Sequence, residues 1–183
     1  TYDLLTLHPA LLNEPLSHSI IGRAVSNGEI AINVHDIRMH AEGRHRQCDD
    51  APYGGGAGMV MKVDVVARAV DAVRREDSIV ILTTPAGVPF TQAVAEDLSK
   101  KSHIVVVCGH YEGVDARVES LVDLEISLGD FVMTGGEILA LAIVDATARL
   151  RSGVLGNNES ARDESFQGNS LEYPQYTRPA EFR

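Results

Sequence analysis

Apolar and polar positions follow one another along this chain in a pattern that predicts a parallel sheet with helices on both faces. Residues 2–7, 79–82, 104–108 and 124–128 are short runs of mostly apolar residues, as buried strands are. Ile30, Ile32 and Val34 alternate with polar residues, which predicts a half-buried or edge strand. We therefore expect the strands to lie in one mostly parallel sheet.

Helical patterns separate these strands. Residues 16–27 predict a helix that Gly28 ends, and a helical period over 65–73 follows Asp64, the expected N-cap. Thr91 opens the next helix, and residues 138–144 are apolar all round, which predicts a buried helix that continues to about residue 150. Alternating strands and helices indicate an α/β fold, a mostly parallel sheet flanked by helices.

Each of the three most apolar strands leads into a loop that contains glycine. Strand 79–82 is followed by residues 83–87, strand 104–108 by residues 109–113, and strand 124–128 by residues 129–137. Ligands of open parallel sheets bind beyond the carboxyl ends of the strands, and glycine lets a backbone approach a ligand closely. The sequence therefore predicts a binding pocket formed by these three loops.

A long segment without periodicity, residues 36–58, interrupts the pattern. It is rich in charge and glycine, and we expect a long loop, because loops of this length are usually functional or disordered. Its basic residues lie close together in the sequence: Arg38, His40, Arg44, His45 and Arg46.

Composition fits one compact domain with an aliphatic core. The chain has 183 residues, of which 44% are hydrophobic and only 5% aromatic. No apolar run approaches the roughly 20 residues of a membrane span, no leader peptide is visible, and two cysteines form no disulfide framework. We expect a cytoplasmic protein without a membrane partner. The net charge of −10 alone argues against a nucleic-acid-binding domain, so the basic cluster is the local exception.

The common nucleotide and hydrolase signatures are absent. The glycine-rich run 54–58 is followed by Met59 and Val60, where a P-loop needs Lys and Ser or Thr. No G-x-G-x-x-G joins a strand to a helix, and no G-x-S-x-G elbow occurs. His45 and Cys48 could contribute to a zinc site, but no second pair completes four ligands, so we expect no metal.

Four motifs carry a resemblance to a known family. They are Pro-Tyr-Gly-Gly-Gly-Ala-Gly-Met at 52–59, Cys-Gly-His-Tyr-Glu-Gly-Val-Asp at 108–115, Ser-Leu-Gly-Asp-Phe-Val-Met-Thr-Gly-Gly-Glu at 127–137 and Tyr-Thr-Arg-Pro at 176–179. In this order they resemble the bacterial tRNA (guanine-N1)-methyltransferases, and the resemblance runs from about residue 5 to residue 179. Any one motif alone would be weak evidence.

This resemblance implies a SPOUT methyltransferase, in which the C-terminal part of the sheet forms a deep trefoil knot. It implies a homodimer with the active site between the subunits and S-adenosylmethionine bound in a bent form. Residues 1–155 would be the catalytic domain that binds this cofactor. Residues 156–183 would be an interdomain linker and the start of a C-terminal tRNA-binding domain that this sequence does not include.

The three loops match the family's cofactor-binding loops. By the resemblance, the residues expected to bind S-adenosylmethionine are Thr84, Pro85, Gly87, Gly109, Tyr111, Glu112, Gly113, Leu128, Gly129, Asp130, Phe131, Val132, Met133, Gly135 and Gly136. Glu112 has a second interpretation, a structural hydrogen bond to the neighbouring loop. The first loop lacks the Tyr, Ser and Gln common in relatives, and His110 stands where relatives often have Arg.

The implied reaction is methylation of N1 of the guanine 3′ of the anticodon, tRNA position 37. A carboxylate can remove the N1 proton, and a cation can stabilise the charge that then develops on O6. Direct register places Glu164 on the family's acid, and a slip of one residue would present Asp163 instead. Arg149 matches the family's arginine. The alternatives are solvated linker charges for the two acids and an i,i+4 ion pair with Asp145 for Arg149.

Arg44, His45, Arg46 and Tyr53 are the expected contacts to tRNA, since basic side chains near an aromatic ring suit a looped-out nucleotide. A solvated, partly disordered loop is the alternative. Two other functions also fit the sequence. One is another SPOUT enzyme that methylates a ribose 2′-hydroxyl or a different base, and the other is a non-catalytic RNA- or nucleotide-binding module.

Overall fold

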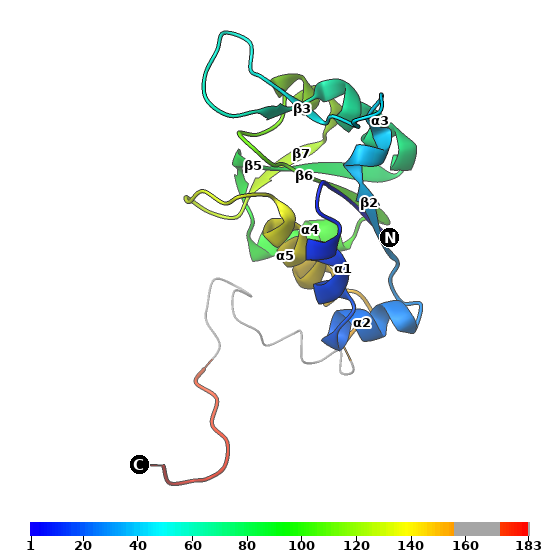
Figure 1. The fold of residues 1–183 in the computed structure, drawn as a ribbon. Helices are drawn as coiled ribbons and strands as arrows, with labels where there is room; N and C mark the ends of the chain where they lie inside the picture. The colour runs from blue at the N-terminus through cyan, green and yellow to red at the C-terminus, as the bar shows by residue number, and fades with distance from the viewer. Residues whose placement is uncertain (156–172, 183) are drawn as a thin grey trace.

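A five-stranded parallel sheet is the centre of the molecule. The computed structural model describes residues 1–155 and 173–182, and Figure 1 shows the sheet between two layers of helices. The strand order is β2-β1-β6-β5-β7, and every neighbouring pair is parallel. The strands are β1 (Tyr2–Thr6), β2 (Ile32–Asp36), β5 (Ser78–Pro89), β6 (His103–Cys108) and β7 (Leu124–Ser127). The parallel sheet and the edge position of β2 confirm the predictions from the sequence.

The two faces of the sheet bury separate hydrophobic clusters. Alternate side chains of β6 point to opposite faces, so Ile104 and Val106 join one cluster while Val105 and Val107 join the other. On the first face lie α1 (Ala10–Leu16), α2 (Ser19–Ser26), α4 (Gln92–Ser99) and α5 (Glu137–Ala148). On the second lie α3 (Val63–Val73) and the short 3-10 helices η1 (Ile37–His40) and η2 (Ala116–Leu121).

The helix predicted over residues 16–27 is wrong in its first part. Leu16 ends α1, His18 is extended, and α2 begins only at Ser19, which has a positive φ of 55°. Gly22 fits this break, because a Cβ there would lie 2.2 Å from the Ser17 carbonyl oxygen. The apolar periodicity runs through both helices, so it did not show the break. Gly28, with φ 75°, follows the end of α2 as predicted.

The predicted N-cap at Asp64 is also wrong by two residues. Lys62 is the N-cap, and Asp64 lies in the first turn, where a carboxylate interacts favourably with the helix dipole and pairs with Arg68 at 2.8 Å. Thr91 is confirmed as the N-cap of α4, since its hydroxyl accepts from the Val94 N–H.

The segment 36–58 is more ordered than a plain loop. It contains η1, which begins where the Asp36 carboxylate accepts from the Arg38 N–H, and β3 (Asp49–Asp50), which pairs with β4 (Val60–Met61). The residues between β3 and β4 form the excursion at the top of Figure 1.

β5 is far longer than the predicted strand 79–82, because it continues after an interruption in its pairing with β7. Thr83 and Val88 both pair with Ile126, so residues 84–87 are extruded between them. Gly87 closes the extruded segment against β7, where a Cβ would lie 2.4 Å from the Ile126 backbone nitrogen. A strand that stops and resumes therefore supplies the first predicted loop. Within the described residues no helix is long and apolar enough to cross a membrane.

Candidate functional site

The three predicted loops meet at the carboxyl edge of the sheet around a cavity of about 200 Å³. This confirms that they converge, the expectation taken from the strand pattern alone. The cavity is lined by Thr83, Thr84, Pro85, Gly109, His110, Tyr111, Glu112, Gly113, Val114, Ser127, Leu128, Gly129, Phe131, Val132, Met133, Thr134, Gly135, Gly136 and Leu139.

A short set of contacts joins the loops at the base of the cavity. The Gly136 N–H donates to the Gly109 carbonyl at 2.9 Å, and the Gly109 N–H donates to the Thr83 hydroxyl at 3.0 Å. The Thr83 hydroxyl itself donates to the Val107 carbonyl. A Cβ on Gly136 would lie 1.8 Å from the Thr83 Oγ1, so only glycine permits this approach. Thr83, Gly109 and Gly136 thus hold one residue of each loop together.

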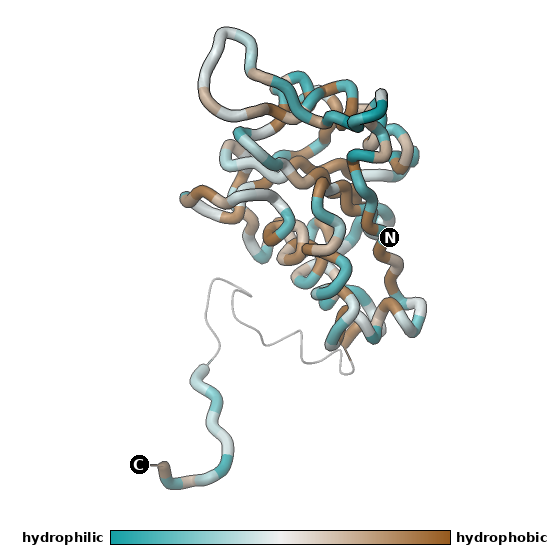
Figure 2. Tube along the Cα trace, viewed as in Figure 1, coloured by the Kyte–Doolittle hydropathy of each residue, from teal (hydrophilic) through white to brown (hydrophobic). Residues whose placement is uncertain are grey.

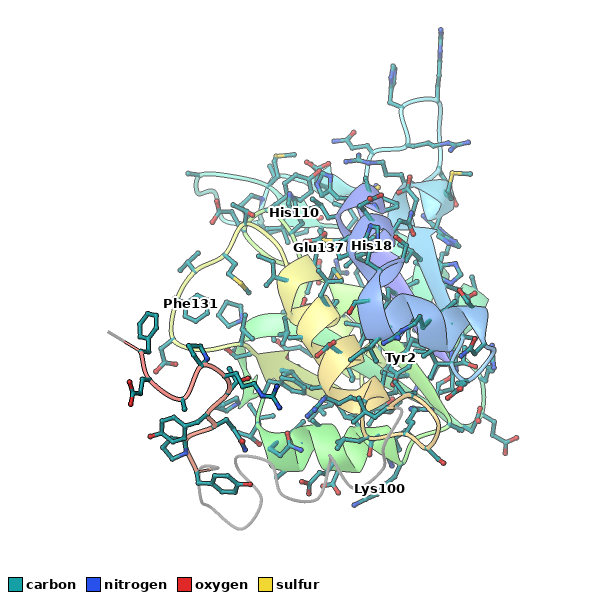
Figure 3. All side chains as sticks on the ribbon, turned by 90° about the horizontal axis from the view of Figure 1, so that it is seen from below. Tyr2, His18, Lys100, His110, Phe131 and Glu137 are labelled. Carbon is teal, nitrogen blue, oxygen red and sulfur yellow. The ribbon has the colours of Figure 1, made fainter. Side chains whose placement is uncertain are left out.

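The second and third loops are also paired by their backbones. His110 and Gly135 form an isolated antiparallel bridge. A Cβ on Gly135 would lie 2.3 Å from Glu137 Oε2 and 2.7 Å from His110 Nδ1, so both side chains pack against this glycine and leave no room for a larger residue. Figure 3 shows His110 and Glu137 close together at the start of α5.

A buried polar cluster lies below this bridge. Glu137 is 4% exposed and its Oε1 accepts from the Thr6 hydroxyl at 2.7 Å. The Thr6 hydroxyl oxygen accepts from the His8 N–H at 2.8 Å, and the His8 and His110 rings face each other with their Nε2 atoms 3.3 Å apart. His110 Nδ1 is buried and has no hydrogen-bond partner among the described residues.

The outer wall of the cavity is apolar and exposed. Phe131 and Val132 are 57% and 92% exposed, and Figure 2 shows hydrophobic residues at the tip of their loop. Met133 and Leu139 are more buried and pack on the core below. The site therefore has a polar base formed largely by backbone groups and an apolar outer wall, as pockets for organic cofactors do.

Most residues expected to bind the cofactor line this cavity, but Gly87 and Asp130 do not. Gly87 packs on β7 instead, and Asp130 is an exposed loop residue. Sequence reasoning missed Thr83, His110, Val114, Ser127, Thr134 and Leu139. Thr83 and Ser127 could have been found, because each stands at the carboxyl end of a predicted strand or in the loop after it.

The end of the glycine-rich run 54–58 lies against the second loop. The Glu112 N–H donates to the Met59 carbonyl at 3.0 Å, and a Cβ on Gly58 would lie 2.3 Å from the Glu112 Cγ. The Met61 N–H donates to the Gly113 carbonyl at 3.0 Å. Glu112 thus lines the cavity and contacts the neighbouring segment, so both interpretations of this residue remain compatible with its position.

The residues expected to contact tRNA are all exposed. Arg44, His45 and Arg46 lie on the surface between η1 and β3, and Tyr53, beyond β3, is fully exposed at 101%. Arg46 has a positive φ of 44° and its guanidinium lies 2.8 Å from the Met39 sulfur. Tyr53 stands just before the glycine run that reaches Glu112, so this exposed ring is connected to the cavity by only a few residues.

The proposed catalytic residues lie apart from the cavity or outside the described residues. Glu164 and Asp163 belong to the segment 156–172, which the structure does not describe. Arg149 is the C-cap of α5, and its N–H donates to the Asp145 carbonyl. Leu139 on α5 lines the cavity, and Arg149 stands ten residues further along this helix, about 15 Å along its axis.

Cys108 ends β6 directly below the loops and does not line the cavity. The thiol is fully buried, and burial raises its pKa well above the ordinary value, with the Glu137 carboxylate adding to the effect. In the described ranges, 1–155 and 173–182, no group of three or more His, Cys, Asp or Glu side chains could hold a metal ion.

Comparison with known proteins decides the family. The family model described as tRNA (Guanine-1)-methyltransferase TrmD matches residues 1–183, the whole chain. The chain belongs to this family.

Curated relatives from several organisms are similar along the whole chain. A Geobacter sp. protein named tRNA (guanine-N(1)-)-methyltransferase is 58% identical over 185 residues, which cover 100% of this chain and 74% of the relative. Proteins of the same name from Carboxydothermus hydrogenoformans and Dictyoglomus turgidum are 52% and 51% identical, covering 99% and 98% of this chain and 72% and 74% of the relatives. The chain thus spans about three quarters of the length of these relatives.

Proposed function

We infer that the protein is a tRNA (guanine-N1)-methyltransferase, and we propose that it methylates the guanine 3′ of the anticodon, tRNA position 37, with S-adenosylmethionine. The observation that carries the proposal is a glycine-lined cavity at the carboxyl edge of a parallel sheet in a chain of the tRNA (guanine-1)-methyltransferase family. Such an enzyme acts where tRNA is modified, so we expect it in the cytoplasm.

The cavity fits S-adenosylmethionine in its chemistry. Glycines 109, 113, 129, 135 and 136 line it, so a ligand can meet backbone N–H and C=O groups directly. The apolar rim of Phe131, Val132 and Met133 suits an adenine ring or a thioether chain. When bound, S-adenosylmethionine supplies an activated methyl group on a sulfonium. The protein's part is then to bind the substrate, align N1 and manage its proton.

Glu164 or Asp163 would accept the N1 proton, because neutral guanine N1 carries a proton and is a poor nucleophile. Arg149 would stabilise the negative charge that moves to O6 as the proton leaves. Neither role needs a metal ion. The acid that acts remains a choice between the two carboxylates, with Glu164 preferred on register.

We further propose a homodimer in which the cavity of one protomer is completed by its partner. Within one chain α5 holds Arg149 about 15 Å along its axis from Leu139 in the cavity wall, so an Arg149 that contacts guanine there would come from a second copy. The exposed apolar side chains around α1, α5 and the cavity rim offer a surface for it: Leu11, Phe131, Val132 and Ile138. Isolated exposed apolar residues are common, but a group of this kind typically marks an interface.

We also propose that the chain forms the trefoil knot of the SPOUT class. Two observations support a threaded path. The strand order β6-β5-β7 places β7 across β5 from β6, and the segment after β7 returns to touch Thr83 and Gly109 through Gly136. Residues 1–155 would be the catalytic domain, and residues 156–183 a linker to a tRNA-binding domain.

Contact with tRNA through Arg44, His45, Arg46 and Tyr53 completes the proposal. All four are exposed, and a fully exposed tyrosine is free to stack on a base. The acidic net charge is no obstacle if these residues meet the phosphates locally.

The decisive experiment measures transfer of a radiolabelled methyl group from S-adenosylmethionine to tRNA transcripts. We expect methylation of a transcript with guanine at position 37 and none when this base is adenine. Nuclease digestion should give 1-methylguanosine. A 2′-O-methylated nucleotide would indicate another SPOUT activity, and calorimetry without any S-adenosylmethionine binding would indicate a non-catalytic module.

Variants Glu164→Ala, Asp163→Ala and Arg149→Ala assign the roles. Replacing the acid that acts as the base should lower turnover by about 100-fold or more, in line with general base catalysis, whereas replacing the other acid should change turnover little. Arg149→Ala should cost a similar factor, with S-adenosylmethionine binding unchanged. Near-normal turnover of both Glu164→Ala and Arg149→Ala would show that this assignment is wrong.

A further inference from the structure

Two histidines, His8 and His110, are in contact below the cavity, and the proposed reaction does not account for this contact. His8 comes from the turn after β1 and His110 from the second loop, yet their Nε2 atoms are 3.3 Å apart and their ring centroids 4.6 Å apart. One of two facing imidazole nitrogens must carry a proton and the other must not, if they are to form a hydrogen bond. The pair therefore holds a single shared proton.

The surroundings of His110 decide which ring donates. Its Nδ1 is buried without a partner and presses on Gly135 together with the Glu137 Oε2. The Glu137 carboxylate lies on the same side of the ring, since its Oε2 and the Nδ1 both flank Gly135, and a carboxylate on that side favours a proton on Nδ1 through space even without a hydrogen bond. A neutral His110 protonated on Nδ1 has a bare Nε2, so His8 is the side that donates.

We propose that His8 is a positioning residue of the S-adenosylmethionine pocket, which holds His110 and the loop 109–113 in place by donating its Nε2–H to His110. This inference rests on the proposed function of the cavity. His110 lines the cavity and its backbone bridges Gly135, so its position fixes the second loop against the third. His8 is itself fixed through its N–H to Thr6, whose hydroxyl donates to Glu137.

The test compares three variants with the parent protein by calorimetric titration with S-adenosylmethionine. In His8→Gln the amide nitrogen can donate in the place of the Nε2–H, whereas His8→Ala offers no donor. The matched control is His18→Gln, since the His18 side chain is 68% exposed and pairs only with Glu14 among the described residues.

At about pH 8 we expect His8→Ala to bind S-adenosylmethionine about 10-fold more weakly, while His8→Gln and His18→Gln stay within about twofold of the parent. A loss of about 10-fold or more in His8→Gln, whose amide still donates, would overturn the proposal, even if His8→Ala fails to fold.

A second measurement needs no ligand. Nitrogen-15 NMR of the imidazoles at about pH 8 should show His110 protonated on Nδ1 and His8 protonated on Nε2. Any other tautomer of His110 contradicts the proposal. A parent protein that shows these tautomers but does not bind S-adenosylmethionine would instead refute the proposed function of the cavity, so the two failures are distinguishable.

Discussion

The two edges of the same sheet use buried histidines and carboxylates in opposite ways. At the amino edge Asp3 is 3% exposed and accepts hydrogen bonds from Asn33 at 2.9 Å, His35 at 2.7 Å and His103 at 2.5 Å. The other His103 nitrogen meets the Ser78 hydroxyl at 2.6 Å. At the carboxyl edge His110 keeps an unpartnered nitrogen beside a cavity.

This difference separates stability from function. A buried polar network whose members satisfy one another stabilises the fold and specifies its register. A site has to leave groups and space for a ligand, and it holds its shape through close backbone contacts instead, here Thr83, Gly109 and Gly136. The serine, histidine and aspartate in a row at the amino edge therefore indicate structure, since they satisfy one another and none of them lines the cavity of the three loops.

The largest expected effect on ligand binding comes from adding one methyl group at the carboxyl edge. Gly136→Ala places a Cβ 1.8 Å from the Thr83 hydroxyl, and β-branched Thr83 is buried and cannot move aside. We expect S-adenosylmethionine binding to fall by about 100-fold or more and the free energy of unfolding to fall by about 3 kcal/mol.

Gly28→Ala is the matched comparison, because no atom lies within 4 Å of a Cβ there and only its φ of 75° is strained. It should cost about 1 kcal/mol and leave binding unchanged. Calorimetry and urea unfolding measure both effects. Equal losses of affinity in the two variants would contradict the role given to Gly136.

At the amino edge the loss should appear in stability and not in binding. Asp3→Ala leaves the donors of Asn33, His35 and His103 without their acceptor, so we expect the free energy of unfolding to fall by about 3–5 kcal/mol. Urea unfolding measures this directly. At a temperature where the variant remains folded, its affinity for S-adenosylmethionine should match that of the parent; a large loss there would show that the two edges are coupled.

The contribution of Asp3 should also disappear in acid. Burial raises the pKa of the Asp3 carboxyl, but the hydrogen bonds from His35, Asn33 and His103 together lower it by more. The net result is a pKa below the ordinary value. A lowered pKa stabilises the folded state above the ordinary value of about 3.9, and this stabilisation is lost as the pH falls through the lower folded value. The stability gap between the parent and Asp3→Asn should therefore narrow below about pH 4, as urea unfolding at several pH values can show. A gap that widens in acid would mean that the sign is wrong.

The smallest effect on stability is expected at Tyr53. Its ring is fully exposed, so Tyr53→Ala should change the free energy of unfolding by less than about 0.5 kcal/mol. If the ring stacks on tRNA, affinity for tRNA should fall about 5-fold or more while affinity for S-adenosylmethionine is unchanged. Filter binding at fixed salt measures the first and calorimetry the second. Unchanged tRNA affinity would remove Tyr53 from the proposed contact surface.

Local sequence predicted the carboxyl edge better than the amino edge. The end of each predicted apolar strand marks the start of a loop, as for strands 79–82, 104–108 and 124–128. Because parallel strands end at the same edge of a sheet, the three loops were expected to meet. Asp3 and His103, by contrast, meet only because β1 and β6 are neighbours in register, which no local pattern reveals.

The same limit applied to the histidine pair and to the helix break. His8 and His110 are far apart in the sequence, and their contact depends on the path of the turn after β1. The break between α1 and α2 lies within an unbroken apolar period, so periodicity predicted one helix there. In the proposed homodimer the position of Arg149 relative to a bound guanine would depend on a second copy of the chain, which a single sequence does not place.

The central claim is that S-adenosylmethionine binds among the three loops at the carboxyl edge. Titration of the nitrogen-15-labelled protein with S-adenosylmethionine tests it most directly, because each backbone N–H reports its own surroundings. We expect the signals of Gly109, Gly113, Leu128, Gly129 and Gly136 to shift in a saturable manner, while those of Asp3, Ser78 and His103 stay in place. Saturable shifts at the amino edge, or none at the three loops, would contradict the account.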